Sequence, residues 1–290
     1  MNDDHVQTKS EIRAALASVA IRPRRRFGQS FLIDGNLMRR LADSAEIKVE
    51  DTVLEIGGGT GGLTDLLVRR AGRVICVEID ERLQEILADR FRGSDGFELV
   101  RGDVLENKNR LSRKLEALLR DDAPPPGGTV KLVANLPYQV ATPVVMNLLL
   151  RFPSVRRFCF TVQLEVGKRL TAPPNCKAYG PLAIMAQLLC RIETICAVPP
   201  QAFWPQPAVD SVMMRMDVGD SPLPDPDELA AFAALVRGAF DHRRKTLRSA
   251  LSYLFDAEGA ARIRDHIDES RRPETFDVAE WLAIHRHLQD

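Results

Sequence analysis

Short apolar runs rich in β-branched residues alternate with stretches of helical periodicity over residues 52 to about 217. Each run has the length of a strand, whereas apolar residues recur every three or four positions between the runs. The predicted strands are 52–56, 74–78, 97–101, 130–134, 157–162, 193–198 and 211–217. Strands separated by helices predict an α/β fold with a doubly wound, Rossmann-like sheet of seven strands. The short final connection would permit one antiparallel edge strand.

A proline-rich stretch divides this pattern from a purely helical tail. The predicted helices of the middle region include 63–70, 81–92, 107–119 and 142–151. The pattern is then interrupted at 219–226. The predicted helices beyond the interruption are 227–240, 243–255 and 276–288. We therefore expect two domains: an N-terminal arm with the sheet in residues 1–218, and a small helical domain in residues 219–290.

Composition bounds the class of protein. The 290 residues are 45% hydrophobic and 28% charged, as in ordinary globular proteins. No apolar run approaches the length needed to cross a bilayer, and the polar N-terminus lacks the apolar core of a signal peptide. We therefore expect a cytoplasmic protein without membrane contact. The five cysteines include no C-x-x-C pair and the histidines are scattered, so we expect neither disulfides nor a bound metal.

The charges balance overall but are unevenly distributed. The chain has 40 Lys and Arg residues and 40 Asp and Glu residues. One basic cluster near the N-terminus contains Arg22, Arg24, Arg25 and Arg26, and a second in the tail contains Arg243, Arg244, Lys245 and Arg248. Runs of like charge are usually solvated faces, but each cluster could also bind the phosphates of a nucleic acid.

A glycine-rich loop follows the first predicted strand. Gly57, Gly59 and Gly62 satisfy G-x-G-x-x-G, and Glu78 ends the next strand about 20 residues further on. This is the fingerprint of a dinucleotide site, in which the loop approaches a pyrophosphate and the carboxylate binds a ribose. Glycines suit such a loop because they allow sharp turns and close approach of a ligand.

The same loop has a second interpretation. Glu55, Gly57, Gly59 and Gly61 spell E-x-G-x-G-x-G, the pattern of methyltransferases built on the same doubly wound sheet. In that case the loop passes the methionine part of S-adenosylmethionine, and Glu78 accepts hydrogen bonds from both ribose hydroxyls. The loop alone does not choose between the two cofactors.

The tetrapeptide after the fourth strand favours methyl transfer. Asn135, Leu136, Pro137 and Tyr138 lie where the carboxyl ends of strands line a ligand crevice. The exocyclic amine of adenine is a poor nucleophile because its lone pair is delocalised. The Asn135 side-chain oxygen and the Leu136 carbonyl could accept both amine hydrogens, while Pro137 fixes the turn. Tyr138 offers a flat face on which an extruded base can stack.

Asp103 ends the third strand at the same edge of the sheet. Its carboxylate could accept a hydrogen bond from the adenine amine of the cofactor. An aspartate that caps a helix or closes a turn would need the same local geometry, so both roles stay open.

These motifs, in this order, resemble those of the ribosomal RNA adenine dimethyltransferases, in particular the KsgA-type enzymes that modify adjacent adenines near the end of small-subunit rRNA. The resemblance covers roughly residues 22 to 275. Further blocks that carry it are 26–32, 163–166, 177–180, 198–203, 205, 209–211 and 239–247.

The resemblance implies roles for particular residues. The implied cofactor contacts are Ser30, Leu32, Gly57, Gly59, Glu78, Asp103 and Asn135. The implied catalytic residues are Asn135, Leu136, Pro137, Tyr138 and Phe203, with Phe203 helping Tyr138 to hold the flipped base. Phe203 could instead be a simple core residue. The two basic clusters would bind rRNA phosphates and release counterions.

The chain departs from the family pattern at four places. Gly58 replaces a proline, Ser30 replaces an asparagine, and Ala208 replaces a lysine. The segment 139–142 reads Gln-Val-Ala-Thr where the family usually has Asn-Ile and a small polar residue. None of these changes alters Glu55 or the tetrapeptide, so the resemblance still implies an active enzyme.

The resemblance also implies the partners. We expect S-adenosyl-L-methionine as cofactor, small-subunit rRNA or a small-subunit precursor as substrate, and a monomer.

Three alternative functions remain open at this point. One is a nicotinamide-dependent dehydrogenase, the second a large-subunit rRNA methyltransferase of the antibiotic-resistance type, and the third a ribosome-assembly factor that acts mainly by binding.

Overall fold

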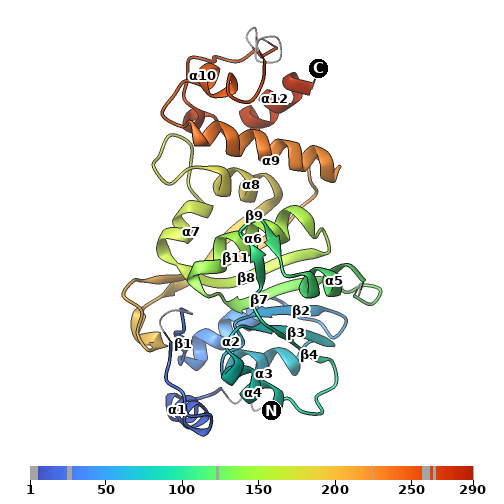
Figure 1. Cartoon of the computed structure of the whole chain (residues 1–290), viewed down its shortest axis with the longest axis vertical. Helices are drawn as coiled ribbons and strands as arrows, with labels where there is room; N and C mark the ends of the chain where they lie inside the picture. Colours follow the sequence, from blue (N-terminus) through green and yellow to red (C-terminus); the bar gives the residue numbers. More distant parts are fainter. Residues whose placement is uncertain are drawn as a thin grey trace. The chain divides into compact units, whose positions relative to one another are not determined.

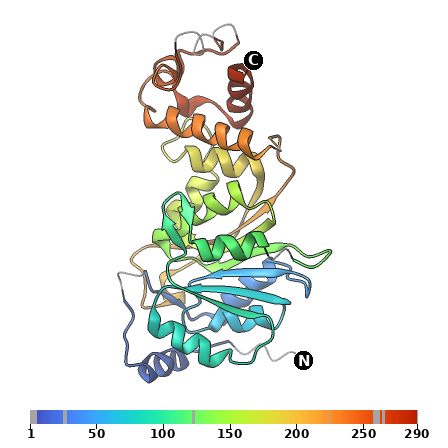
Figure 2. The same ribbon diagram turned by 45° about the vertical axis from the view of Figure 1, so that its right-hand side comes forward.

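The computed structural model divides the chain into two compact units, which are described separately (Figures 1 and 2). Unit 1 contains residues 1–167 and 193–218, and unit 2 contains residues 168–192 and 219–290. The described residues are 6–24, 28–121, 124–223, 225–256, 262–263 and 266–289. In this part of the chain, no helix is long and apolar enough to cross a membrane.

Unit 1 is built on a seven-stranded sheet, so the predicted fold class is confirmed. Its strands, in spatial order, are β4 (Phe97–Arg101), β3 (Arg73–Glu78), β2 (Thr52–Ile56), β7 (Val130–Asn135), β8 (Val155–Gln163), β11 (Ser211–Val218) and β9 (Cys190–Val198). All seven predicted strands are present. β2, β3, β4, β7 and β8 pair in parallel. β2 is buried along its whole length, which explains its uninterrupted apolar pattern.

The antiparallel strand is not at the edge of the sheet, so that expectation was wrong. β11 pairs antiparallel with β8 and lies between β8 and β9. The edge position belongs to β9, which precedes β11 in the chain. β11 thereby gains hydrogen-bonding partners on both sides, which an edge strand lacks.

Helices cover both faces of the sheet (Figures 1 and 2). One face carries α2 (Gly35–Ser44), α3 (Gly62–Val68) and α4 (Glu81–Arg90), and the other carries α5 (Arg113–Asp121) and α6 (Tyr138–Arg151). The N-terminal helix α1 (Lys9–Ser18) precedes a two-stranded sheet of β1 (Phe31–Leu32) and β10 (Phe203–Trp204).

The predicted helix at 107–119 is only partly correct. β5 (Leu105–Asn107) and β6 (Arg110–Leu111) form a hairpin, and the helix α5 begins at Arg113. The Asn107 side chain accepts a hydrogen bond from the Asn109 backbone N–H at 2.9 Å, which stabilises the turn. Such local side-chain hydrogen bonds compete with helix formation and are invisible to the apolar periodicity.

Unit 2 is helical, and it takes in more of the chain than the predicted domain. Besides α9 (Pro226–Asp241), α10 (Leu247–Leu251), the short η3 (Pro273–Thr275) and α12 (Val278–Gln289), it includes α8 (Pro181–Leu189). α8 contacts both α9 and α12. The division has a break at the expected position, 218/219, and differs from the expected domains in that residues 168–192 also belong to unit 2, because the strongly apolar α8 packs against helices of the tail. The boundary passes through α7 (Leu164–Leu170) and β9.

The helix predicted at 243–255 is shorter in the structure. Residues 242–245 form a turn after α9, in which the Lys245 N–H donates to the His242 carbonyl at 2.8 Å. Thr246 then caps α10, because its side chain accepts a hydrogen bond from the Ser249 N–H.

Candidate functional site

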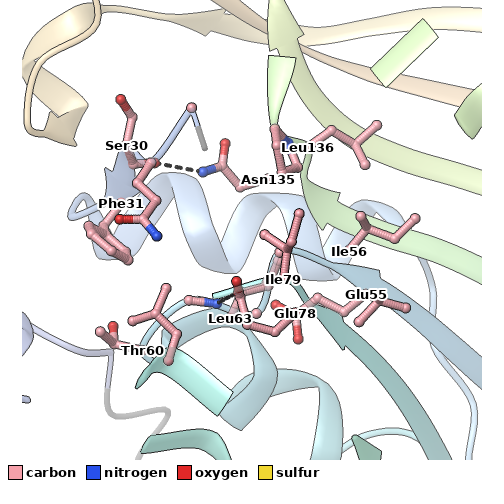
Figure 3. Close-up of a pocket in the computed structure, with 18 of the residues that line it drawn as sticks. Ser30, Phe31, Glu55, Ile56, Thr60, Leu63, Glu78, Ile79, Asn135 and Leu136 are labelled. Carbon is pink, nitrogen blue, oxygen red and sulfur yellow. Dashed lines mark hydrogen bonds between the residues drawn. The ribbon is translucent and has the colours of Figure 1, made fainter. Parts of the chain in front are cut away.

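A cavity of about 360 Å³ opens in unit 1 near the carboxyl ends of β2, β3 and β7 (Figure 3). It contains every residue that the resemblance implied as a cofactor contact, namely Ser30, Leu32, Gly57, Gly59, Glu78, Asp103 and Asn135. Leu136, Pro137 and Tyr138 line the same cavity. The structure thus brings together residues that are more than 100 positions apart in the sequence.

The glycine loop after β2 needs glycine at positions 57 and 59 for the same two reasons, a positive φ and a lack of space for a side chain. Gly57 and Gly59 both have positive φ, at +80° and +60°. A Cβ atom at Gly57 would lie 3.0 Å from Cγ of Pro137, and one at Gly59 would lie 3.1 Å from the Phe31 ring. The loop therefore runs close to the wall of the cavity, with no room for side chains.

Glu78 is held rigidly at the end of β3. Its Oε2 accepts a hydrogen bond from the Gly59 N–H and its Oε1 accepts one from the Asp80 N–H, both at 2.9 Å. The side chain is only 4% exposed, and burial raises the pKa of Glu78 above its ordinary value. Each oxygen keeps a second acceptor site, so the carboxylate can still bind two hydroxyl groups.

Glu55, near the end of β2, bonds to Thr64 in the helix that follows the glycine loop. It is buried, and the Thr64 hydroxyl donates to its Oε2 at 2.6 Å. Burial raises the pKa of Glu55 to about 7. Beside it, a Cβ atom at Gly58 would lie 2.3 Å from Sγ of Cys76. In this chain the space that a side chain at position 58 would need is filled by the Cys76 thiol, which accounts for glycine there.

Asn135 is oriented by the N-terminal arm. Its Nδ2 donates a hydrogen bond to the Ser30 backbone carbonyl at 3.0 Å (Figure 3). This contact directs the amide nitrogen towards Ser30 and leaves Oδ1 as the acceptor of the group. This chain has Ser30 where the family usually has an asparagine. The hydrogen bond to Asn135 does not depend on that difference, because its acceptor is the backbone carbonyl of residue 30.

Tyr138 is fixed at the start of α6. Pro137 is the N-cap residue of this helix, and the Tyr138 hydroxyl forms a hydrogen bond with Ser211 Oγ at 2.6 Å. Ser211 is buried, and burial raises the pKa of Tyr138 above its ordinary value. Sequence reasoning quoted Ser211 only as part of a family block and gave it no role.

Phe203 does not lie in the cavity, in contrast to the role implied for it. It is 1% exposed and packs in the core of unit 1 with Leu32, which it faces across the β1–β10 pair. Phe31 lines the cavity instead and stacks on Trp204, with ring centroids 6.5 Å apart. Because Phe203 is buried in the core against Leu32, its ring has no exposed face on which a base could stack.

Asp103 closes a turn at the rim of the cavity, and its role as a cofactor contact stays a prediction. Its Oδ1 accepts a hydrogen bond from the Leu105 N–H at 2.9 Å, so the residue closes a turn. The side chain is exposed and lines the cavity, so its second oxygen remains available to a ligand.

The N-terminal arm is anchored beside the cavity through Asp80. The Arg24 backbone N–H donates to Gln29 Oε1 at 2.7 Å, and Gln29 Nε2 donates to Asp80 Oδ2 at 3.0 Å. The Arg24 guanidinium also lies 3.5 Å from Asp80. Arg22 is exposed, whereas Arg25 and Arg26 lie outside the described residues.

Gln7 is a cavity residue that sequence reasoning missed. It is 5% exposed, and the Thr60 hydroxyl of the glycine loop donates to its Oε1 at 2.6 Å. The helix that follows it had a signal, because Thr8 and Glu11 form a capping box. No pattern in the sequence indicated the hydrogen bond between Gln7 and the glycine loop.

The members of the basic cluster of unit 2 differ in whether they lie close to an acidic side chain. Arg243 donates to Glu274 at 2.7 Å and to the Lys177 carbonyl at 3.3 Å. Arg248 is 68% exposed and lies 3.7 Å from Glu269. Arg244 and Lys245 are exposed. Over the described part of the chain, no group of three His, Cys, Asp or Glu residues is arranged to hold a metal ion.

The sheet order and the cavity together define a Rossmann-like methyltransferase. The order differs from the six-stranded dinucleotide-binding sheet by the antiparallel β11 between β8 and β9. The family model described as "Ribosomal RNA adenine dimethylase" matches residues 21–290. The chain therefore belongs to the ribosomal RNA adenine dimethylase family, whose methyl donor is S-adenosylmethionine.

Individual relatives agree with this assignment. "Ribosomal RNA small subunit methyltransferase A" of Moorella thermoacetica is 36% identical, with 99% of each chain covered. The enzyme of the same name from Listeria monocytogenes is 37% identical, with 91% of this chain and 90% of the relative covered.

Solved structures include relatives of two kinds. A dimethyladenosine transferase from Plasmodium falciparum superimposes with a TM-score of 0.68 at 24% identity, covering 88% of this chain and 95% of that one. The 23S rRNA methyltransferase ErmE superimposes with a TM-score of 0.63 at 25% identity, covering 90% and 100%. Membership of the family excludes the dehydrogenase interpretation of the glycine loop.

Proposed function

We propose that this chain transfers two methyl groups from S-adenosyl-L-methionine to the exocyclic amine of each of two adjacent adenines in small-subunit rRNA. The observation that carries the proposal is the orientation of Asn135. Because its Nδ2 is bound to the Ser30 carbonyl, Oδ1 is left to accept a hydrogen from the target amine. The small-subunit substrate follows from the names of the relatives at 36–37% identity.

The cavity fits the cofactor. At Gly57 and Gly59 a Cβ atom would already be in tight contact with the cavity wall, so the absence of side chains leaves a cradle for a ligand. The two anchored oxygens of Glu78 suit the paired hydroxyls of a ribose. Asp103 offers one oxygen to an adenine amine, and Ser30 and Leu32 cover the cavity from the N-terminal side. The cofactor supplies an electrophilic methyl group on a sulfonium.

The chain's own residues activate and position the amine. Asn135 Oδ1 and the Leu136 carbonyl accept its two hydrogens, which draws the nitrogen towards tetrahedral geometry. Tyr138, held by Ser211, presents its ring to the extruded base. No strong base would be needed: the nitrogen proton becomes acidic once the nitrogen carries the methyl group and would pass to water, and S-adenosylhomocysteine would be the leaving group. The rate enhancement comes from positioning and from aimed acceptors.

The substrate is a structured RNA, and the basic clusters would bind its phosphates. The residues that we assign to this role are Arg22, Arg24, Arg25, Arg26, Arg243, Arg244, Lys245 and Arg248. We assign the protein to the cytoplasm, as a monomer that acts on a precursor of the small subunit. A role in small-subunit assembly would accompany this activity.

The large-subunit alternative has one observation in its favour, the similarity to ErmE. The identity to that structure is 25%, against 36–37% to the small-subunit enzymes over nearly the whole chain. We therefore keep the small-subunit substrate as the proposal.

The decisive experiment uses purified protein, labelled S-adenosylmethionine and unmethylated small ribosomal subunits. The RNA is digested and the labelled nucleoside is identified. Dimethyladenosine at adjacent positions is the expected result. Transfer to naked large-subunit RNA alone would support the resistance-type alternative. Tight binding to subunits without transfer to any RNA would support an assembly factor that acts by binding.

A further inference from the structure

Two aromatic side chains from the two ends of the basic segment of unit 2, residues 242–254, lie against each other. The ring of Tyr253 stacks on the ring of His242, with centroids 4.0 Å apart and planes inclined by 14°. Tyr253 is nevertheless 63% exposed, so His242 covers only part of the ring. Most large apolar side chains in the described residues of unit 2 are buried, among them Phe232, Phe276 and Trp281.

Backbone hydrogen bonds and a helix cap hold the segment that carries the pair. His242 ends α9, and its carbonyl accepts a hydrogen bond from the Lys245 N–H at 2.8 Å. Thr246 caps α10, and the Tyr253 N–H donates to the Ala250 carbonyl just after that helix. The chain between the two residues runs through the turn after α9 and the short helix α10 (Figure 1), and the two rings stack across this connection.

The charge around the pair has one sign. Residues 242–254 contain four Arg or Lys residues and no Asp or Glu residue. Of the four, Arg243 is tied to Glu274 and Arg248 lies near Glu269, whereas Arg244 and Lys245 are exposed. An exposed aromatic ring among cations is complementary to an unpaired nucleotide, which combines a flat base with a charged phosphate. A base inside a duplex is stacked between its neighbours and offers no free face.

We propose that Tyr253, backed by His242, is a stacking platform for one unpaired base of the RNA substrate, and that Arg244 and Lys245 bind the adjoining phosphates. This site lies in unit 2, outside the cavity described above. The proposal rests on the proposed function, because it requires an RNA substrate. The competing explanation is that the stack only stabilises the turn between α9 and α10.

The test compares Tyr253→Phe, Tyr253→Leu and Tyr253→Ala in the full-length protein. Affinity for unmethylated small subunits is measured over a series of salt concentrations, with melting temperatures recorded in parallel. We expect Phe to bind within twofold of wild type and both Leu and Ala to weaken binding about 5- to 100-fold. The slope of log affinity against log salt should stay unchanged in all three, whereas Arg244→Ala should reduce it by about 0.7 to 0.9.

A matched control is Val49→Ala, which shortens an exposed apolar side chain of unit 1 and should bind as wild type does. The KM for S-adenosylmethionine should not change in any Tyr253 variant. Wild-type affinity in Tyr253→Leu would overturn the proposal. So would losses of affinity that follow the melting temperatures and not the presence of an aromatic ring. If these variants bind normally while wild type methylates subunits, only this inference fails; if wild type neither binds nor methylates them, the proposed function fails as well.

Discussion

The cavity of unit 1 and the basic segment 242–254 of unit 2 were both predicted from sequence. The structure brings the residues predicted for the cavity together, but it distinguishes cations of the basic segment that the sequence did not. In the cavity, all seven residues implied as cofactor contacts meet at one place. In the basic segment, four cations look equivalent in the sequence, but Arg243 is partly buried and bonded to Glu274. By contrast, Arg248, Arg244 and Lys245 are exposed and, of these, Arg248 lies 3.7 Å from Glu269. Motifs at strand ends converge because parallel strands end at the same edge of the sheet. No comparable rule says where charged side chains on a surface will lie. Which acidic side chains lie next to them decides whether they can bind a phosphate.

The largest expected effect is in the cavity, at Asn135. Asn135→Ala removes the oriented acceptor of the target amine and should lower kcat for methyl transfer about 100- to 1,000-fold. Affinity for small subunits should stay nearly unchanged. Asn36→Ala, which alters an exposed asparagine at the start of α2, should behave as wild type. Equal losses of transfer and of RNA binding would contradict the role given to Asn135.

Glu55 should make stability depend on pH. The pKa of Glu55 is about 7 in the folded protein against an ordinary value of 4.5. Between these values the folded chain keeps a proton that the unfolded chain releases, so the free energy of unfolding falls as pH rises from 4.5 to 7. The fall amounts to about 3 kcal/mol at most, at about 1.4 kcal/mol per unit.

Glu55→Gln should therefore flatten this profile in urea unfolding measured from pH 4.5 to 8. Some dependence of the unfolding free energy on pH should remain in Glu55→Gln, because burial also raises the pKa of Glu78. Glu50→Gln changes an exposed carboxylate and serves as the control. An unchanged slope in Glu55→Gln would show that Glu55 is ionised in the folded protein at neutral pH.

Glu78 should control affinity for the cofactor. Glu78→Gln places an NH₂ group opposite one of two backbone N–H donors, from Gly59 and Asp80, and removes the charge. We expect the Kd for S-adenosylmethionine, measured by calorimetry, to rise about 10- to 100-fold. Glu98→Gln on the neighbouring strand β4 should leave it unchanged. A normal Kd in Glu78→Gln would remove the ribose contact from the proposal.

The hydrogen bond between Tyr138 and Ser211 should have a moderate effect on the reaction. Ser211→Ala and Tyr138→Phe each remove it, at a cost of about 1 kcal/mol, or about fivefold in kcat. Because both changes remove the same contact, the double variant should lose no more than either single variant. Additive losses would mean that the two residues act independently.

The smallest effects are expected at the cations of unit 2 and would sharpen the contrast among them. Arg243→Ala breaks the contact with Glu274 and should lower the free energy of unfolding by about 1 kcal/mol. Arg244→Ala should leave stability unchanged and only weaken RNA binding at low salt. Urea unfolding of the two variants checks the difference; equal stability would mean that the pairing of Arg243 contributes nothing.

The sequence determined the elements, because their signals are local. The seven strands, the cofactor loop and the tetrapeptide were all found by periodicity or by fixed spacing. Prediction failed where a local side-chain contact replaced the expected pattern, as at Asn107, which closes a hairpin inside a predicted helix. It also failed at the end of the sheet, because nothing in the pattern of β11 says which strands it will lie between.

Only the tertiary structure decided how the site is held. The hydrogen bond between Asn135 and Ser30 joins residues 105 positions apart, and that between Gln7 and Thr60 joins residues 53 apart. Phe203 packs in the core with Leu32, while Phe31 lines the cavity. Periodicity reports which face of one element is buried, but not what the chain will pack against it. The chemistry of this site could therefore be predicted from the chain alone, whereas its rigid geometry depends on contacts that exist only once the sheet and the arm have come together.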